Sequence, residues 1–373
     1  MLGQQHDLVP AFGFNSTDPR QLIQSLRLFM DPKRHRQVSD TSLGLANVLY
    51  LSLLILHTEQ QESSHITAAT ILGIEEPEAH LHPQMQRVVF RDLLRSKRSI
   101  LVSTHSPNIA SVTPVESLVI LRTVGGESQI ASFADATGFS VEERADLERY
   151  LNVTRAEIVF GRGIILVEGD AERFVIPAAA GLLPTPVALD EFGISVCSVA
   201  GTDFVPYAKL LKTLGIPFVV VTDGDSSDAT AASSPGIERG TRIVDAIGDK
   251  ASAAAIKDGI ADAKVDEARA ALARAGIFVG SRTLETDLVA KGAGPRLKAA
   301  FKALFPGSRE VTLSPFDTTG AVTDAQEGAI ISLAERAGKG RLAQSFAAQM
   351  SANDVPTYVR MAIEEIIKKC RRV

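Results

Sequence analysis

The sequence predicts an α/β protein in which a mostly parallel sheet is flanked by helices. Short apolar runs of strand-forming residues, at 164–167 and 218–221, alternate with segments of helical character. Each of these runs ends in an acidic cluster, as expected where a parallel strand gives way to a loop at the ligand edge of an open sheet. The length of 373 residues, with 45% hydrophobic and 22% charged residues, fits a globular chain of two or three domains.

The first part of the chain, residues 1–157, is expected to form one α/β domain. The pattern predicts a helix at 42–57, a strand at 70–74, a helix at 83–94, a strand at 100–103 and a hairpin around 124–126. A polar helical segment at 140–156 is expected to connect this domain to the next. We therefore place the first boundary at 157–158.

The second part, residues 158–293, shows the strand, helix, strand order of a parallel sheet. Strands are predicted at 163–167, 194–199, 217–222 and 277–279, with helices from 171 and at 204–214. Between the last two strands, residues 229–275 are rich in serine, alanine and glycine, and their alanine-heavy stretch favours a helical insertion. Residues 294–373 have a helical pattern and form a third, C-terminal region.

Acidic residues follow two of the predicted strands. Glu168 and Glu172 come after the strand at 163–167, and Asp223 and Asp225 come after the strand at 217–222. Two carboxylates about 4 Å apart repel by roughly 4 kcal/mol at an effective dielectric near 20, so such a cluster calls for cations. Ligands that are all oxygen favour Mg²⁺, Mn²⁺ or Ca²⁺ over Zn²⁺. The sequence therefore predicts a metal-dependent phosphoryl-transfer site at this edge.

The overall composition argues against several classes of protein. The two cysteines, Cys197 and Cys370, form no Cys-x-x-Cys pair, so neither a structural zinc site nor a disulfide framework is expected. No signal-peptide layout opens the chain, and the longest apolar stretch, 46–56, is about half a membrane span. We expect a cytoplasmic protein without a membrane partner. The formal net charge of −5 leaves DNA binding open, because basic runs remain at 33–36 and 368–372.

The order of these acids resembles a known enzyme fold. A glutamate that ends one strand, Glu168, and an Asp-x-Asp that ends a later one, Asp223 to Asp225, resemble the Toprim domain of topoisomerases, primases and certain nucleases. Within that superfamily the chain looks most like the OLD (overcoming lysogenization defect) nucleases, which join an ABC-type ATPase to a Toprim domain. The segments 284–287 and 339–341 resemble later motifs of that family.

The resemblance implies a site for two Mg²⁺ or Mn²⁺ ions, with Ca²⁺ as a structural substitute. Glu168 and Glu172 would bind one ion and Asp223 would be shared, while Asp225 and Glu285 would complete the second. Two ions about 3.5–4 Å apart can activate a water and stabilise the leaving oxygen during attack on phosphorus. No nucleophilic side chain is then needed.

Lys339 would offset the charge that develops on the phosphorus centre. Simpler interpretations of three of these residues remain open. Glu172 could be a first-turn acid that stabilises a helix N-terminus, Glu285 could be an ordinary surface acid, and Lys339 could be an exposed loop lysine.

Three segments of the first half resemble motifs of ABC-type ATPases. Residues 71–83 resemble the Walker B strand, 101–107 the switch-histidine loop, and 42–45 the signature loop. By this resemblance Glu75 would support Mg²⁺, Glu76 would polarise the attacking water, and His105 would sense the γ-phosphate.

One motif of these ATPases is missing from the sequence. No Gly-x-x-x-x-Gly-Lys-[Ser/Thr] loop is present, and the single Gly-Lys pair, Gly338-Lys339, lacks the preceding glycine. Without that cradle of backbone N–H groups the nucleotide phosphates have no binding loop. We expect ATP to act as a cofactor only if a lobe with this Walker A loop is supplied, and the chain to be the carboxyl portion of a longer product.

Together these patterns predict a DNA endonuclease of the OLD type that uses two divalent metal ions. The resemblance implies ATP regulation with the full ATPase, a homodimer, a helicase partner, and a role in phage defence or DNA processing. One alternative is a non-catalytic ABC/Toprim-like assembly module. Another is a topoisomerase or primase, although the four tyrosines (Tyr50, Tyr150, Tyr207 and Tyr358) lie in no visible cleavage motif and two cysteines are too few for a zinc ribbon.

Overall fold

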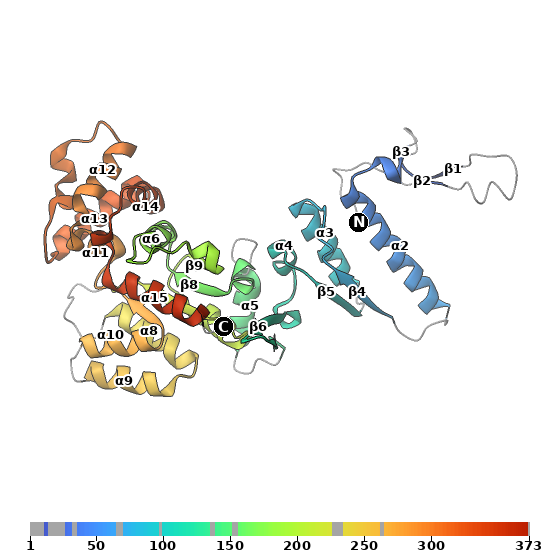
Figure 1. Ribbon diagram of the computed structural model, residues 1–373, viewed down its shortest axis with the longest axis horizontal. Helices are drawn as coiled ribbons and strands as arrows, with labels where there is room; N and C mark the ends of the chain where they lie inside the picture. Colours follow the sequence, from blue (N-terminus) through green and yellow to red (C-terminus); the bar gives the residue numbers. More distant parts are fainter. Residues whose placement is uncertain are drawn as a thin grey trace, which may run out of the picture. The chain divides into compact units, whose positions relative to one another are not determined.

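The computed structural model describes residues 11–13, 27–31, 36–64, 70–96, 99–134, 139–150, 156–225, 234–261 and 265–371. The chain divides into two compact units, Met1–Pro114 and Val115–Val373. Figure 1 shows their helices and strands, with labels on many of them. The boundaries predicted at 157–158 and 293–294 remain predictions about functional domains.

The first unit contains a parallel pair of strands, β4 (Ile71–Glu75) and β5 (Ser99–Ser103), in register from Ile71 opposite Ser99 to Glu75 opposite Ser103. The remaining described elements of this unit are β1 (Ala11–Gly13), β2 (Arg27–Asp31), β3 (Arg36–Gln37), α2 (Leu43–Ser63), α3 (Pro83–Arg95) and α4 (Pro107–Ala110). A core of apolar residues from α2, α3 and α4 packs against the inward-facing side chains of the two strands. The predicted helices and strands of this region are present, with α2 extending six residues beyond the predicted end at 57.

Local signals explain where these helices begin. The Ser42 hydroxyl accepts a hydrogen bond from Leu45 N at 3.4 Å and caps α2. α3 follows a His82 cap and begins with Pro83, whose fixed φ suits the first helical turn. β4 and β5 end at Glu75 and Ser103, and the loops that follow them contain Glu76 and His105.

The second unit is organised by a four-stranded parallel sheet with the order β11-β10-β8-β9. These strands are β8 (Gly163–Val167), β9 (Ile194–Ser198), β10 (Phe218–Thr222) and β11 (Ile277–Val279). Every residue of β8, β10 and β11 is buried, as expected for parallel strands that are covered on both faces. An antiparallel hairpin, β6 (Val119–Val124) with β7 (Glu127–Ser132), precedes this sheet and turns at Gly125 and Gly126, both with positive φ.

Helices cover the sheet and continue to the end of the described chain. They are α5 (Val141–Tyr150), α6 (Asp170–Gly181), α7 (Val205–Thr213), α8 (Pro235–Ala246), α9 (Lys250–Ala261), α10 (Val265–Arg274), α11 (Leu284–Leu288), α12 (Gly294–Leu304), α13 (Asp324–Ala337), α14 (Lys339–Ala347) and α15 (Thr357–Arg371). The predicted helical insertion corresponds to α8, α9 and α10, and the predicted C-terminal helical region to α12 through α15 (Figure 1). Among the described helices, none is long and apolar enough to cross a membrane.

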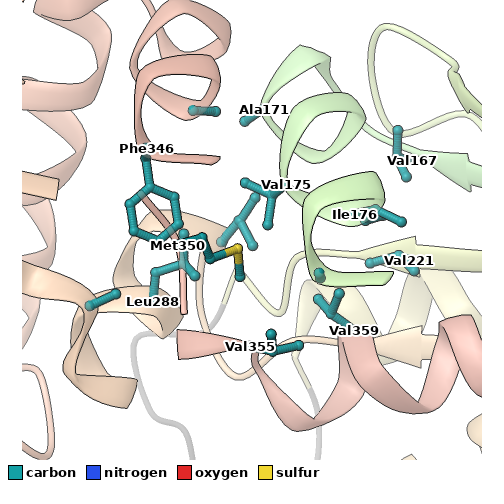
Figure 2. Packing of buried hydrophobic residues seen from close by; sticks show 14 of the residues in the cluster. Val167, Ala171, Val175, Ile176, Val221, Leu288, Phe346, Met350, Val355 and Val359 are labelled. Carbon is teal, nitrogen blue, oxygen red and sulfur yellow. The ribbon is translucent and has the colours of Figure 1, made fainter. Parts of the chain in front are cut away.

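One hydrophobic core joins the sheet of the second unit to the C-terminal helices. Figure 2 shows Val175 of α6 turned toward Phe346 and Met350, and all three are buried. Val359 of α15 belongs to the same core as Val221 of β10. The C-terminal helices are therefore packed against the sheet, and α14 is held against α6 at the side of the sheet where the acidic loops begin.

Candidate active site

The acidic loops meet at the point where the sheet connections change direction. β8 and β10 are neighbours, but the chain runs from β8 outward to β9 and from β10 outward to β11 on the other side. Such a switch point leaves a crevice at the carboxyl ends of the two strands. Glu168 directly follows β8, and Asp223 directly follows β10, so the predicted acids lie at the crevice.

The Glu168 carboxylate links the ends of these two strands. Its Oε1 accepts hydrogen bonds from Thr222 Oγ1 at 2.5 Å, Asp223 N at 2.9 Å and Arg239 Nη1 at 2.7 Å. These three donors fix one oxygen of Glu168. No donor from the described residues reaches its other oxygen, which is left available to a ligand.

Asp223 sits among like charges. Its carboxylate receives no hydrogen bond from the described residues. Burial raises the pKa of Asp223 well above its ordinary value, and neighbouring acids raise the pKa further; they are Glu172, Glu168, Glu285 and Asp225. Asp223 is therefore a half-buried carboxylate surrounded by four other acids, an arrangement that an added cation would stabilise.

Glu172 both caps the start of α6 and lies near the other acids. The side chain is only 6% exposed, and its Oε2 accepts a hydrogen bond from Gly169 N at 3.2 Å at the start of α6. Burial raises the pKa of Glu172 to about 7, opposed by backbone hydrogen bonds and reinforced by the charges of Glu285 and Glu168. The helix-start interpretation and the site interpretation are therefore compatible.

Glu285 and Lys339 come to the crevice from later parts of the chain. Glu285 lies in α11 and is buried, in contrast to an ordinary surface acid. Lys339 begins α14, and its Nζ lies 4.0 Å from Glu285 Oε2. α14 can approach α6 closely because Gly340 has no side chain, and a Cβ there would lie 3.0 Å from Asp170 Cβ. The structure thus brings Lys339 to the acids, although its side chain is 42% exposed.

Arg239 is a residue of this crevice that sequence reasoning missed. It lies in α8, is 6% exposed, and its Nη2 lies 2.6 Å from Asp225 Oδ2 while Nη1 binds Glu168. Because residues 229–275 have the pattern of an insertion apart from the sheet, none of them is predicted to join the site. The available signal was a charged residue on the apolar face of α8, between Ile237 and Ile243.

Arg239 also explains how the acids are arranged. Among the described residues, no three Asp, Glu, His or Cys side chains surround a common point as ligands of one ion. Asp225 is turned to the guanidinium instead and is one of the few described residues other than glycine with positive φ, at 48°. The candidate ligand atoms are all carboxylate oxygens, which suit Mg²⁺ or Mn²⁺ in kind. Asp225 would have to leave Arg239 before it could bind such an ion.

The loops after β10 and β11 are shaped by close backbone contacts. Gly224 N donates to Arg282 O at 2.8 Å, and a Cβ on Gly224 would lie 2.5 Å from both Gly280 O and Ser281 O. Asp287 Oδ2 accepts from Ser281 N at 2.9 Å, and burial raises the pKa of Asp287 to about 6. The short segment 284–287 therefore supplies Glu285 to the crevice and Asp287 to the loop that supports it.

The ATPase-like residues of the first unit also lie at strand ends. Glu75 ends β4, Glu76 follows with a positive φ of 39°, and His105 Nε2 lies 3.6 Å from Glu76 Oε1. The structure thus places the predicted water-polarising acid beside the predicted switch histidine. Glu78, for which the sequence predicts no role, fixes this loop, since its Oε1 accepts from Thr104 Oγ1 and His105 N, both at 2.8 Å.

Two sequence families match the chain, one in each half. An AAA ATPase domain family matches residues 16–110, and the family described as "Overcoming lysogenization defect protein-like, TOPRIM domain" matches residues 159–225. The solved C-terminal region of the Burkholderia pseudomallei OLD protein is 35% identical to this chain, with a TM-score of 0.46. The match covers 99% of that region and 57% of this chain. The chain belongs to the OLD family.

Two curated relatives agree with this assignment. The OLD nuclease of Thermus scotoductus is 28% identical over 57% of this chain and 41% of the relative. Endonuclease GajA of Bacillus cereus is 23% identical over 49% of this chain and 30% of the relative. This OLD-family chain spans less than half the length of the curated relatives that it matches. Its sequence combines an ATPase-type segment with a Toprim domain, and the predicted fold class is confirmed.

Proposed function

We propose that this chain is a divalent-metal-dependent DNA endonuclease that hydrolyses phosphodiester bonds at its Toprim crevice. The observation that supports this most strongly is the Asp223 carboxylate, which faces four acids and receives no hydrogen bond from the described residues. A bound cation would relieve the repulsion among these acids. The relatives of this chain include proteins named as an OLD nuclease and an endonuclease. The activity of this chain is inferred from both observations together.

In this proposal five acids would hold two Mg²⁺ or Mn²⁺ ions: Glu168, Glu172, Asp223, Asp225 and Glu285. Bound ions of this kind lower the pKa of a water and neutralise charge on the scissile phosphate. The protein contributes the positions of the acids. Glu168 is fixed through one oxygen and presents the other, and Glu172 is held at its backbone contact with Gly169.

Lys339 would act on the phosphate rather than on the ions. Its ammonium lies 4.0 Å from Glu285 Oε2 at the edge of the acidic group, where a phosphate bound to the ions would gain negative charge during attack. Because the Lys339 side chain is half-exposed, its ammonium can act on a bound phosphate as a point charge. A water is the nucleophile in this scheme, so no side chain becomes covalently attached.

A topoisomerase would need a tyrosine nucleophile, and the tyrosine nearest these acids is poorly suited. Burial raises the pKa of Tyr358 well above its ordinary value, and the charges of Asp287 and Asp223 raise the pKa further. A phenol that resists ionisation is a weak nucleophile. Hydrolysis therefore fits the crevice better than covalent strand passage.

The test is a plasmid-nicking assay with the purified chain in Mg²⁺ or Mn²⁺. We expect nicking that EDTA abolishes and that Glu168→Gln and Asp223→Asn each reduce by at least about a hundredfold, the scale seen when one transition-state contact is removed. Asp317→Asn is the control, because Asp317 pairs with Lys298 away from the crevice. Nicking that survives in both Toprim variants would refute the assignment.

The ATPase-type half is proposed to regulate the nuclease rather than to work alone. Glu75, Glu76 and His105 fit the roles of metal support, water polarisation and phosphate sensing, but ATP turnover would need the Walker A loop that this sequence lacks. We further propose a homodimer that acts on DNA in the cytoplasm, in phage defence or DNA processing, with a helicase as partner.

A second candidate is a non-catalytic assembly module. The observation that favours it is Arg239, which neutralises Glu168 and Asp225 without any ion. This candidate predicts a melting temperature that depends on Mn²⁺ without any DNA cleavage. The nicking assay and a melting curve on the same preparation separate the two functions.

A further inference from the structure

Arg239 is held by four groups of the acidic crevice. Its Nη1 donates to Glu168 Oε1 at 2.7 Å, Thr222 Oγ1 at 2.5 Å and Asp223 O at 3.2 Å, and its Nη2 donates to Asp225 Oδ2 at 2.6 Å. A guanidinium that bridges two acids proposed as metal ligands occupies part of the space and charge that an ion would use.

The two ends of the guanidinium are in different surroundings. Nη1 contacts the inner part of the crevice, where Thr222 is 1% exposed. Nη2 contacts Asp225, whose side chain is 36% exposed and whose backbone has a φ of 48°. The Nη2 contact is therefore the weaker restraint, because water can replace it and because the loop around Asp225 is in a less favoured conformation.

α8 itself has little room to move. Its second residue, Gly236, lies directly on the Asp-x-Asp loop, and a Cβ there would meet Asp223 O and lie 2.8 Å from Gly224 Cα. Ser234 caps this helix end, with its hydroxyl accepting from Ile237 N at 3.3 Å. Any adjustment at the crevice must therefore come from the Arg239 side chain and from Asp225 rather than from the helix.

We propose that Arg239 is a positioning residue that competes with divalent metal for Asp225. In the metal-free protein Nη2 holds the Asp225 carboxylate, while Nη1 orients Glu168. On metal binding, Nη2 would release Asp225, and Nη1 would keep Glu168 in place. This inference rests on the proposed nuclease site and adds to it a built-in competitor that sets the metal affinity.

The competition has a measurable size and direction. Charge-assisted hydrogen bonds of this kind correspond to about tenfold to hundredfold in an equilibrium constant. Replacing Arg239 should therefore tighten metal binding by about tenfold or more while making the metal-free protein less stable, because the acids lose their internal counter-charge. If Arg239 had a structural role alone, its replacement would lower both the metal affinity and the stability of the metal-free protein.

The experiment titrates the full chain with Mn²⁺ alone by calorimetry and records melting curves in EDTA and in Mn²⁺. The variants are Arg239→Met, Arg239→Lys and, as the matched control, Lys339→Met. Lys339 has the same charge but contacts Glu285 only at 4.0 Å, so its loss reports on net charge without a bridge. Arg239→Lys keeps the charge and reaches one acid at most, so an intermediate affinity is expected. If Arg239→Met does not fold, the Mn²⁺ affinity of Arg239→Lys is compared with that of the wild type, and tighter binding by Arg239→Lys is expected.

We expect Arg239→Met to bind Mn²⁺ about tenfold more tightly than the wild type. Its melting temperature in EDTA should be lower, and Mn²⁺ should raise that melting temperature by more than it does for the wild type. An equal increase in Mn²⁺ affinity in Arg239→Met and Lys339→Met would overturn the competition, because the loss of one positive charge would then explain the increase. Unchanged or weaker binding in both Arg239 variants would overturn it too. If the wild-type chain binds no Mn²⁺, the proposed metal site fails as well, which distinguishes that outcome from failure of the competition alone.

Discussion

Glu168 Oε1 accepts a hydrogen bond from Asp223 N at 2.9 Å, although the two residues are 55 positions apart in the sequence. The contact joins the end of β8 to the end of β10 at the switch point of the sheet. It directs one Glu168 oxygen inward, and the Asp223 side chain stays among the other acids. The pairing of these strand ends therefore brings Glu168 and Asp223 together.

The stability of the metal-free chain should fall as the pH rises from about 4.5 to 7. Glu172 has an ordinary pKa of 4.5 that burial raises to about 7 in the folded protein, so within this window the folded state binds more protons than the unfolded state. The shift corresponds to roughly 3 kcal/mol, and Asp223 changes in the same direction. Urea unfolding in EDTA at pH 5 and pH 8 measures the loss.

The variant Glu172→Gln should flatten this dependence. Its amide oxygen can still accept from Gly169 N, but it carries no charge at pH 8, so the metal-free variant should be more stable there than the wild type. Glu335→Gln, at an exposed position, should leave the pH profile unchanged. A wild-type profile that is flat, or that rises over the same window, would show that Glu172 is not buried as described.

Lys339→Met should slow nicking by about a hundredfold or more and leave the free energy of unfolding within about 1 kcal/mol of the wild type. The side chain is 42% exposed and its distance of 4.0 Å from Glu285 permits only a weak ion pair. Lys298→Met is the converse control, since Lys298 pairs with Asp317 at 2.7 Å outside the crevice and should affect stability alone. Normal nicking by Lys339→Met would remove Lys339 from the site.

Gly224→Ala should disturb both the fold and the crevice. The new Cβ would lie 2.5 Å from two backbone oxygens of the neighbouring loop, and these cannot swing away as a side chain could. We expect a loss of about 1–3 kcal/mol in stability together with loss of nicking. Gly181→Ala, in α6 with nothing within 4 Å of its added Cβ, should be neutral or slightly stabilising by thermal melting. Equal behaviour of the two variants would contradict the close loop contact.

The chain alone should not hydrolyse ATP above the background rate. Glu76 and His105 are 3.6 Å apart and could act on a nucleotide, but the sequence contains no Walker A loop for its phosphates. Phosphate release should be the same for the wild type and Glu76→Gln. Turnover that disappears in Glu76→Gln would show that the phosphates are bound in some other way.

Much of the fold could be predicted because its strands are short, fully apolar and bounded by turn residues. The strands predicted at 163–167 and 277–279 have those bounds in the structure. The spatial order β11-β10-β8-β9 could not be predicted from periodicity, since buried strands carry no pattern that identifies their neighbours. The acids were nevertheless expected together, because every parallel strand ends at the same edge.

The site was predicted less completely than the sheet. The five acids and Lys339 were named from motifs, and the structure brings them to one crevice, while their catalytic roles remain predictions. Arg239 was not named, because a single arginine inside a helical insertion has no local signal that indicates its partners. Its contacts with Glu168 and Asp225 depend on how α8 is seated on the loop after β10.

The most direct test of the central claim is anomalous scattering from crystals of the full chain grown with Mn²⁺. We expect two manganese peaks among Glu168, Glu172, Asp223, Asp225 and Glu285, with Arg239 Nη2 no longer within hydrogen-bond distance of Asp225. Crystals with Mn²⁺ in excess that show no peak in this crevice, and Arg239 still bridging Glu168 and Asp225, would contradict it.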